Sequence, residues 1–196
     1  SAPEGGLWRS NDAGVTWNIM SDFWEHLSVG DLVYDLNNTN ILYVATDDHD
    51  SWFNNNRGVL KSTDGGTTWN IVGLLSAQAY NVYKLGMYPD GSTLYACTNA
   101  GLFTSSDAGV TWVMNTALPT NVNDLEFHPT NSQVVYATTR GGVSPNVGYM
   151  YVSTDGGTTF VQQTMTLDSK GRTTQICVSP NNPDIVWIGV YPEPPS

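Results

Sequence analysis

Two loops of the sequence carry acids, imidazoles and aromatic rings at close spacing, a combination that suits carbohydrate binding. One covers residues 47–57 (DDHDSWFNNNR) and the other covers residues 21–27 (SDFWEHL). Sugar rings stack on flat aromatic faces, while carboxylates and imidazoles hydrogen-bond sugar hydroxyls. An exposed loop that only contacts solvent is the alternative interpretation. The candidate ligand-binding residues are Trp24, Glu25, His26, Asp47, Asp48, His49, Asp50, Trp52, Phe53 and Arg57, with Arg140 at the start of a further long loop, 140–148.

The acids in these loops also raise the question of catalysis. Hydrolysis of a glycosidic bond needs two carboxyl groups that face each other across a cleft, one of them with a raised pKa. Glu25, Asp47, Asp48, Asp50 and Asp168 supply carboxyls, but the sequence does not fix their separation, so no catalytic residue is assigned. The run from Asp47 to Asp50 lacks the glycine and the distal glutamate of an EF-hand loop, so neither a metal site nor a cofactor is predicted.

A repeated octapeptide indicates the elements that must position these loops. It reads SNDAGVTW at 10–17, STDGGTTW at 62–69, SSDAGVTW at 105–112 and STDGGTTF at 153–160. The copies recur at intervals of about 43 to 52 residues, which is the length of a four-stranded propeller blade. Each period is therefore expected to form one small antiparallel sheet.

Four short apolar segments in each period predict the strands. The octapeptide joins the third strand to the fourth as a hairpin turn, and turn-forming residues separate the first strand from the second. The chain begins on a third strand and reaches a second strand near its end. The first strands are expected at 31–36, 84–89, 124–129 and 175–180, the second at 41–47, 93–99, 134–140 and 185–191, the third at 6–9, 58–61, 101–104 and 149–152, and the fourth at 18–20, 70–72, 113–115 and 161–163.

The octapeptides resemble the Asp box (BNR repeat), S-x-D-x-G-x-T-W, of bacterial sialidases, sortilin-type receptors, xyloglucanases and the photosystem II assembly-factor propeller. This resemblance implies a β-propeller in which the boxes are scaffolding turns on the face opposite the binding site. The aspartate is expected to accept backbone N–H groups, the glycine to adopt a positive φ, and the aromatic ring to pack on a neighbouring sheet. The residues at these positions are Asp12, Gly14, Trp17, Asp64, Gly66, Trp69, Asp107, Gly109, Trp112, Asp155, Gly157 and Phe160.

Charge and composition exclude several classes of partner. The net charge of -11 repels nucleic-acid backbones and anionic lipid surfaces, so we expect no nucleic-acid partner. No apolar run approaches the roughly 20 residues of a membrane span, so no direct membrane insertion is expected. Cys97 and Cys177 lie in strand-like runs and are expected to be buried thiols, and Trp8 and Trp187 are expected to lie in the core.

The sequence therefore predicts one all-β domain over residues 1–196, an arc of blades from a larger propeller that is completed by further chain or by a partner subunit. The alternative is a closed four-bladed ring in which GLWRS pairs with IVWIGVY. The expected function is non-catalytic binding of a glycan or protein, outside the cell or at its surface. A fragment or relative of a polysaccharide-degrading glycoside hydrolase similar to the xyloglucanases is the alternative, whereas sialidase activity is disfavoured because the Arg-Ile-Pro signature is absent.

Overall fold

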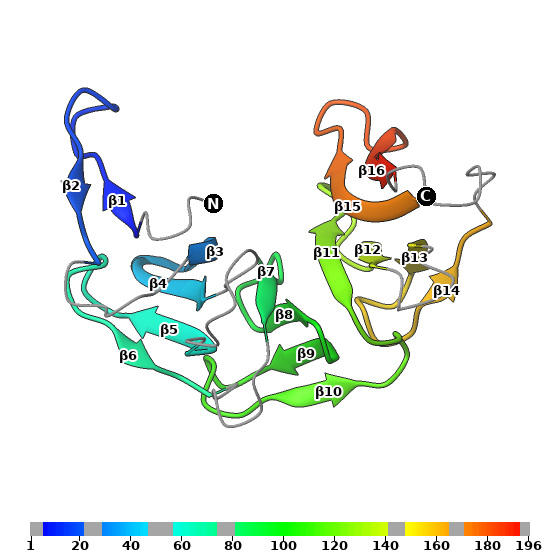
Figure 1. The fold of residues 1–196 in the computed structure, drawn as a ribbon, viewed down its shortest axis with the longest axis horizontal. Coiled ribbons are helices and arrows are strands. Elements are labelled where there is room, and N and C mark those ends of the chain that lie inside the picture. The colour runs from blue at the N-terminus through cyan, green and yellow to red at the C-terminus, as the bar shows by residue number, and fades with distance from the viewer. Residues whose placement is uncertain are drawn as a thin grey trace.

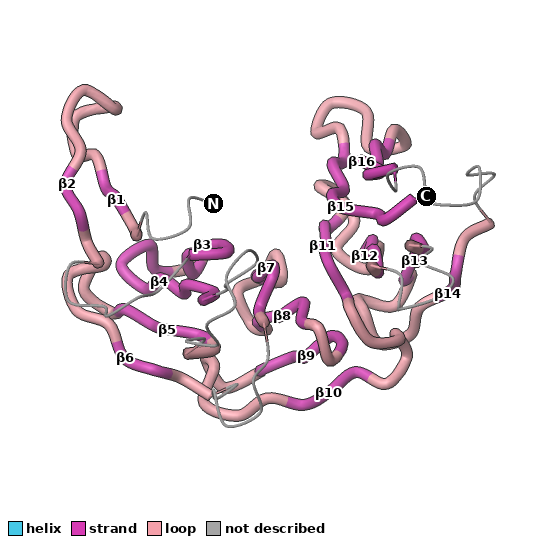
Figure 2. The backbone as a smooth tube through the Cα atoms, viewed as in Figure 1, coloured by secondary structure: helices cyan, strands magenta, loops and turns pink. Residues whose placement is uncertain are grey.

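The computed structural model describes residues 6–21, 29–46, 57–73, 81–140, 148–164 and 171–192. Strands and loops account for all of these residues, as Figure 2 shows in magenta and pink, and none of them is helical. The described part of the chain thus holds no helix that could span a membrane.

Three complete sheets form the centre of the molecule (Figure 1). Each is an antiparallel meander of four strands that are consecutive in the chain. We call each sheet a blade. The first blade contains β3 (Val29–Asp35), β4 (Asn38–Thr46), β5 (Val59–Ser62) and β6 (Asn70–Ile71); the second contains β7 (Val82–Met87), β8 (Leu94–Thr98), β9 (Gly101–Ser105) and β10 (Val113–Asn115); the third contains β11 (Val122–Phe127), β12 (Val135–Thr139), β13 (Tyr149–Ser153) and β14 (Val161–Gln162).

A two-stranded half-blade stands at each end of this row. β1 (Trp8–Arg9) pairs with β2 (Asn18–Ile19), and β15 (Gly171–Val178) pairs with β16 (Val186–Pro192). The first half-blade thus contains a third and a fourth strand, and the last contains a first and a second strand, as the sequence predicts. β1 and β16 belong to separate sheets on opposite sides of the opening in Figure 1, so the closed four-bladed ring is wrong.

The first strand of each blade lines the inside of the arc, where β3 packs against β7, β7 against β11, and β11 against β15. These four inner strands share an irregularity that the sequence analysis did not anticipate. In each, the pairing register with the second strand shifts at the same place, just before Asp31, Lys84, Asp124 and Gln175. An extra residue at this point re-aims the side chain that follows it. All four inner strands therefore present the residue after the bulge in the same way.

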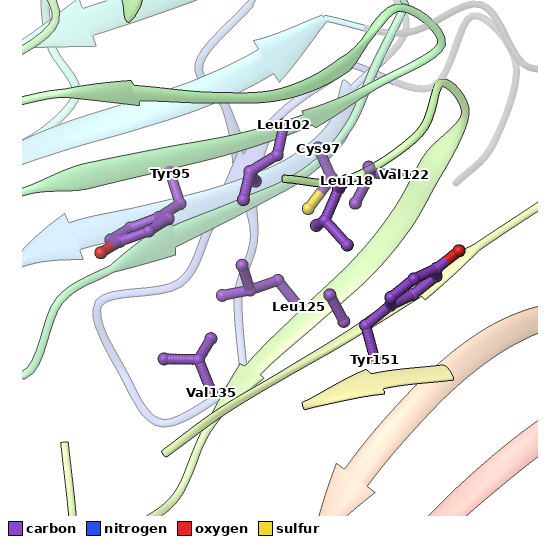
Figure 3. Packing of buried hydrophobic residues seen from close by; sticks show 9 residues of the cluster. Tyr95, Cys97, Leu102, Leu118, Val122, Leu125, Val135 and Tyr151 are labelled. Atoms are coloured by element: carbon purple, nitrogen blue, oxygen red, sulfur yellow. The ribbon is translucent and has the colours of Figure 1, made fainter. Parts of the chain in front are cut away.

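The hydrophobic core lies between neighbouring blades. One cluster joins the second blade to the third, and Figure 3 shows Cys97 and Leu102 of the second blade with Leu125, Val135 and Tyr151 of the third. Another cluster joins the first blade to the second and includes Tyr43 and Leu85. A core side chain is buried here only where an adjacent blade covers it.

Three predictions of burial are wrong for this reason. Trp8 is 51% exposed and Trp187 is 69% exposed, although both occupy core positions of the repeat. Cys97 is buried as expected, but Cys177 is exposed. These three residues lie in the two half-blades, where no described strand covers the outer face.

Candidate functional site

Most of the predicted sugar-binding residues lie outside the described residues. These are Trp24, Glu25, His26, Asp47, Asp48, His49, Asp50, Trp52 and Phe53. The structure places the two arginines, which flank the long loops between second and third strands. Arg57 is exposed, and its backbone N–H donates to Thr46 Oγ1 at 2.9 Å. Arg140 is half-buried, and its backbone N–H donates to the carbonyl of Asn121 at 2.7 Å.

The octapeptides form the turns at the opposite end of the sheets from these loops. In the first blade, Asp64 Oδ1 accepts the Thr68 N–H at 2.8 Å and Asp64 Oδ2 accepts the Thr68 hydroxyl at 2.6 Å. The Ser62 hydroxyl donates to Asp64 Oδ1 and accepts the Gly66 N–H, both at 2.8 Å. Equivalent bonds hold Asp12, Asp107 and Asp155.

The glycines and aromatic rings of the octapeptides complete the turns. Gly14, Gly66, Gly109 and Gly157 have φ between 88° and 89°, a region that glycine enters without strain. The indoles of Trp17, Trp69 and Trp112 donate to the carbonyl of the glycine three residues earlier. Trp69, Trp112 and Phe160 pack against core clusters, whereas Trp17 is 59% exposed in the first half-blade.

The four octapeptide carboxylates are exposed but hydrogen-bonded. Hydrogen bonds from the threonine hydroxyl, the threonine N–H and the serine hydroxyl lower the pKa of Asp12, Asp64, Asp107 and Asp155 to about 2. A carboxylate whose pKa is lower in the folded than in the unfolded state stabilises the fold above its unfolded pKa, about 3.9. That contribution is lost as the pH falls towards 2.

We therefore expect the melting temperature to fall as the pH decreases from about 4 to about 2. Carboxyl ¹³C titrations should give midpoints near 2 for these four aspartates. Thr68→Val, which removes one hydroxyl donor, should raise the midpoint of Asp64 and leave that of Asp107 unchanged. A midpoint of Asp64 near 4 in the unaltered chain would contradict this account.

A second cluster lies on the inner strands, where the sequence analysis predicted no site. Lys84 Nζ lies 3.8 Å from Asp31 Oδ2, 4.0 Å from Asp124 Oδ1 and 3.9 Å from Glu126 Oε1. The three carboxylates come from β3 and β11, on either side of the strand that carries the lysine. We call these four residues the inner-strand cluster.

Two carboxylates of the inner-strand cluster also join one blade to the next. Asp31 Oδ2 accepts the backbone N–H of Leu85 at 3.0 Å, and Asp124 Oδ2 accepts the N–H of Ile176 at 2.7 Å. In both cases the residue after the bulge bonds to the inner strand of the following blade. The second blade has Lys84 at this position, and an ammonium group cannot accept such a bond. Lys84 instead balances the acids of its two neighbours.

Burial and charge act in opposite directions on these groups. Burial alone would lower the pKa of Lys84, but attraction to Asp31, Asp124 and Glu126 outweighs it and the pKa is raised. Burial raises the pKa of Asp124 despite its hydrogen bond from Ile176, and it raises the pKa of Glu126 despite Lys84. Within the described ranges, no group of three or more acids, histidines or cysteines is arranged to hold a metal ion.

A polar cavity of about 330 Å³ opens beside the inner-strand cluster. Such a cavity can bind a hydroxyl-rich molecule through the ammonium of Lys84 and the carboxylates of Asp124 and Glu126. The indole of Trp187 supplies an apolar surface. The sequence holds one signal for this site: Asp31, Lys84, Asp124 and Gln175 are the first residues of four aligned first-strand segments. The lining residues are Lys84, Asp124, Glu126, Gln175, Ile176, Cys177, Trp187 and Gly189.

Comparison with known structures identifies the architecture. The chain superposes on the GH74 xyloglucanase from Xanthomonas campestris with a TM-score of 0.73 and 16% identity, covering 96% of this chain and 32% of that one. It superposes on YCF48 bound to D1 peptide with a TM-score of 0.64 and 17% identity, covering 96% of this chain and 56% of that one. The chain is an arc of a β-propeller. The prediction of an arc rather than a closed ring is confirmed.

Curated relatives of the arc are xyloglucanases. The xyloglucanase of a Paenibacillus species is 32% identical over 80% of this chain and 18% of its own length. Xyloglucanase Xgh74A of Acetivibrio thermocellus is 26% identical over 79% of this chain and 22% of its own length. The arc thus spans about a fifth of the length of these relatives. No protein-family model matches the chain.

Proposed function

We propose that this chain is a glycan-binding section of a glycoside hydrolase-like propeller, with xyloglucan or a related β-glucan as its ligand. The observation that carries the proposal is the 32% identity to the Paenibacillus xyloglucanase over 80% of the chain. The resemblance of the fold to a GH74 xyloglucanase agrees with it. Because such polysaccharides lie outside cells, we also propose an extracellular or cell-surface location.

The glycan is proposed to bind at the end of the sheets that carries the loops between second and third strands. Residues 47–57 and 140–148 are far longer than the corresponding connection at Asn99 and Ala100, and excess loop length is typical of binding sites. Trp24 and Trp52 would provide stacking surfaces, and the adjacent acids would bond to hydroxyls. The octapeptides occupy the other end, and we assign them a structural role.

Hydrolysis is the second candidate function, because the curated relatives are named xyloglucanases. Among the described acids, Asp31 and Asp124 bond to backbone N–H groups and contact Lys84, which suits the joining of blades better than acid and base catalysis. Glu126 is half-exposed and has a raised pKa, which suits a general acid. We assign the catalytic step to no residue.

Calorimetric titration with xyloglucan oligosaccharides tests the binding proposal. Trp52→Ala and Trp24→Ala should each weaken binding by about tenfold and leave the melting temperature within about 1 °C, because a ring that serves as a sugar-stacking surface contributes little to the core. Trp17→Ala is the matched control, since Trp17 is exposed at the opposite end of the sheets. No measurable binding, or equal losses in all three variants, would disprove this site.

Release of reducing sugar from xyloglucan separates hydrolysis from binding alone. Glu126→Gln should leave binding intact and should abolish release if Glu126 is the general acid. Binding without release would restrict the chain to the non-catalytic function.

A further inference from the structure

The inner-strand cluster carries more negative than positive charge. Asp31, Asp124 and Glu126 contribute three carboxylates, and Lys84 contributes one ammonium group. Lys84 Nζ lies 3.8–4.0 Å from one oxygen of each acid, which is longer than a hydrogen bond. The three acids therefore share the ammonium through Coulomb attraction, and none of these three oxygens accepts a hydrogen bond from it. With all four groups ionised, two negative charges remain unbalanced.

The other titratable groups around the cluster are two thiols, a phenol and an imidazole. They are Cys97 on β8, Cys177 on β15, Tyr136 on β12 and His128, which follows β11. Thiols and phenols are never positively charged. The imidazole of His128 is held in the turn beyond the strand, where its Nδ1 accepts the backbone N–H groups of Thr130 and Asn131. Among the described side chains, Lys84 is thus the cation that balances the three acids.

Asp124 and Glu126 differ in the bonds that they make. Asp124 is buried, its Oδ1 accepts the Leu125 N–H at 2.9 Å, and its Oδ2 accepts the Ile176 N–H at 2.7 Å. Such bonds favour an ionised carboxylate. The Glu126 side chain is 38% exposed, and no group in the described part of the chain donates a hydrogen bond to its carboxylate. Glu126 can therefore take up a proton from solvent without the loss of a bond between blades.

We propose that Glu126 is an acid-responsive site, which takes up a proton as the pH falls from 7 towards 4 and thereby strengthens the contact of the third blade with the second blade and β15. Protonation removes one of the two unbalanced charges and leaves Lys84 to Asp31 and Asp124. The bonds that these two acids accept from inner-strand N–H groups are kept. The inference does not depend on the proposed glycan binding.

The direction of the effect follows from the surroundings of Glu126. Burial raises the pKa of Glu126, Lys84 acts against this rise, and the charge of Asp124 adds to it. A carboxyl group whose pKa is higher in the folded than in the unfolded state stabilises the fold as the pH falls through the folded pKa. The gain is complete below the unfolded pKa, about 4.3. The octapeptide carboxylates, whose pKa is about 2, act in the opposite direction but at lower pH.

Glu126→Gln tests the proposal in the 196-residue chain, because glutamine resembles the protonated acid and does not titrate. At pH 7 the variant should melt about 2–4 °C above the unaltered chain, since it carries one unbalanced charge fewer. If Glu126 acted merely as a stabilising ion-pair partner of Lys84, the variant would melt at a lower temperature instead. An equal or lower melting temperature of the variant at pH 7 would overturn the proposal.

The pH dependence of melting provides a second measurement. Between pH 7 and about pH 4.5, the melting temperature of the unaltered chain should rise, and Glu126→Gln should lose at least about half of this rise. Asp184→Asn, a change at an exposed acid outside the cluster, is the matched control and should keep it. Acids elsewhere titrate in all three chains, so the differences isolate position 126. The same rise in all three chains would contradict the role of Glu126.

Two local measurements complete the test. Carboxyl ¹³C titration should give a midpoint for Glu126 above the ordinary value of about 4.3. Hydrogen exchange at the Ile176 amide reports on the contact between the third blade and β15, and at pH 7 it should be at least about threefold slower in Glu126→Gln than in the unaltered chain. A midpoint at or below the ordinary value, or faster exchange at Ile176 in the variant, would refute the proposal.

Discussion

Replacing Tyr95 by alanine is expected to lower the free energy of unfolding by about 3–5 kcal/mol, because the ring fills the space between two blades. The ring is 5% exposed and meets Phe127 edge-on, with 5.4 Å between ring centres. Its hydroxyl donates to the carbonyl of Gly156 at 2.8 Å, and burial raises its pKa to about 12. The alanine variant loses both the packing and the hydrogen bond.

Tyr95→Phe separates these two contributions. It keeps the ring and removes the hydroxyl, so the expected loss is about 1 kcal/mol. Tyr34→Ala is the control for removal of a tyrosine from a strand, because Tyr34 is exposed. Denaturant unfolding measures all three variants. A Tyr95→Ala variant within about 1 kcal/mol of the unaltered chain would show that this contact does not hold the blades together.

Asp124→Ala should destabilise the chain by about 3 kcal/mol, because it leaves the Ile176 N–H without its acceptor and removes one partner of Lys84. Asp124→Asn keeps an acceptor oxygen and should cost less. Asp184→Ala, which removes an exposed acid, is the matched control and should change stability by less than about 0.5 kcal/mol.

Hydrogen exchange at the Ile176 amide locates the effect of Asp124→Ala. Exchange there should accelerate at least about tenfold, whereas exchange at Leu85, which bonds to Asp31, should change only with global stability. Unchanged protection of the Ile176 amide would show that the bond to Asp124 does not join the third blade to β15.

Turn chemistry is local, and this explains which features could be predicted from the sequence. The serine, aspartate, glycine and threonine of each octapeptide lie within eight consecutive residues, so their spacing predicts the turns and the strands on either side. The loop residues around Trp52 lie outside the described part of the chain and stay predictions.

The inner-strand cluster could not be predicted in the same way. Asp31, Lys84 and Asp124 belong to different periods of the repeat, and only the stacking of blades brings them together. The predicted burial of Trp187 and Cys177 is also wrong. Trp187 occupies the position of the buried Tyr43 and Tyr95, but its burial requires a covering blade. Cys177 occupies the position of Val33 and Glu126, which are only half-buried in the complete blades.

The meander order of the blades has a consequence for folding. Every strand pair joins neighbours in the chain, and the first blade is complete between Val29 and Ile71. Because all four strands of a blade lie within one short stretch of sequence, closing the loops between them costs little chain entropy. Pairing of strands within a blade can therefore precede the stacking of one blade on the next. A chain emerging from the ribosome could therefore form each sheet before the next is synthesised. Contacts between blades would then determine cooperativity, as they do in solenoid proteins built from stacked repeats.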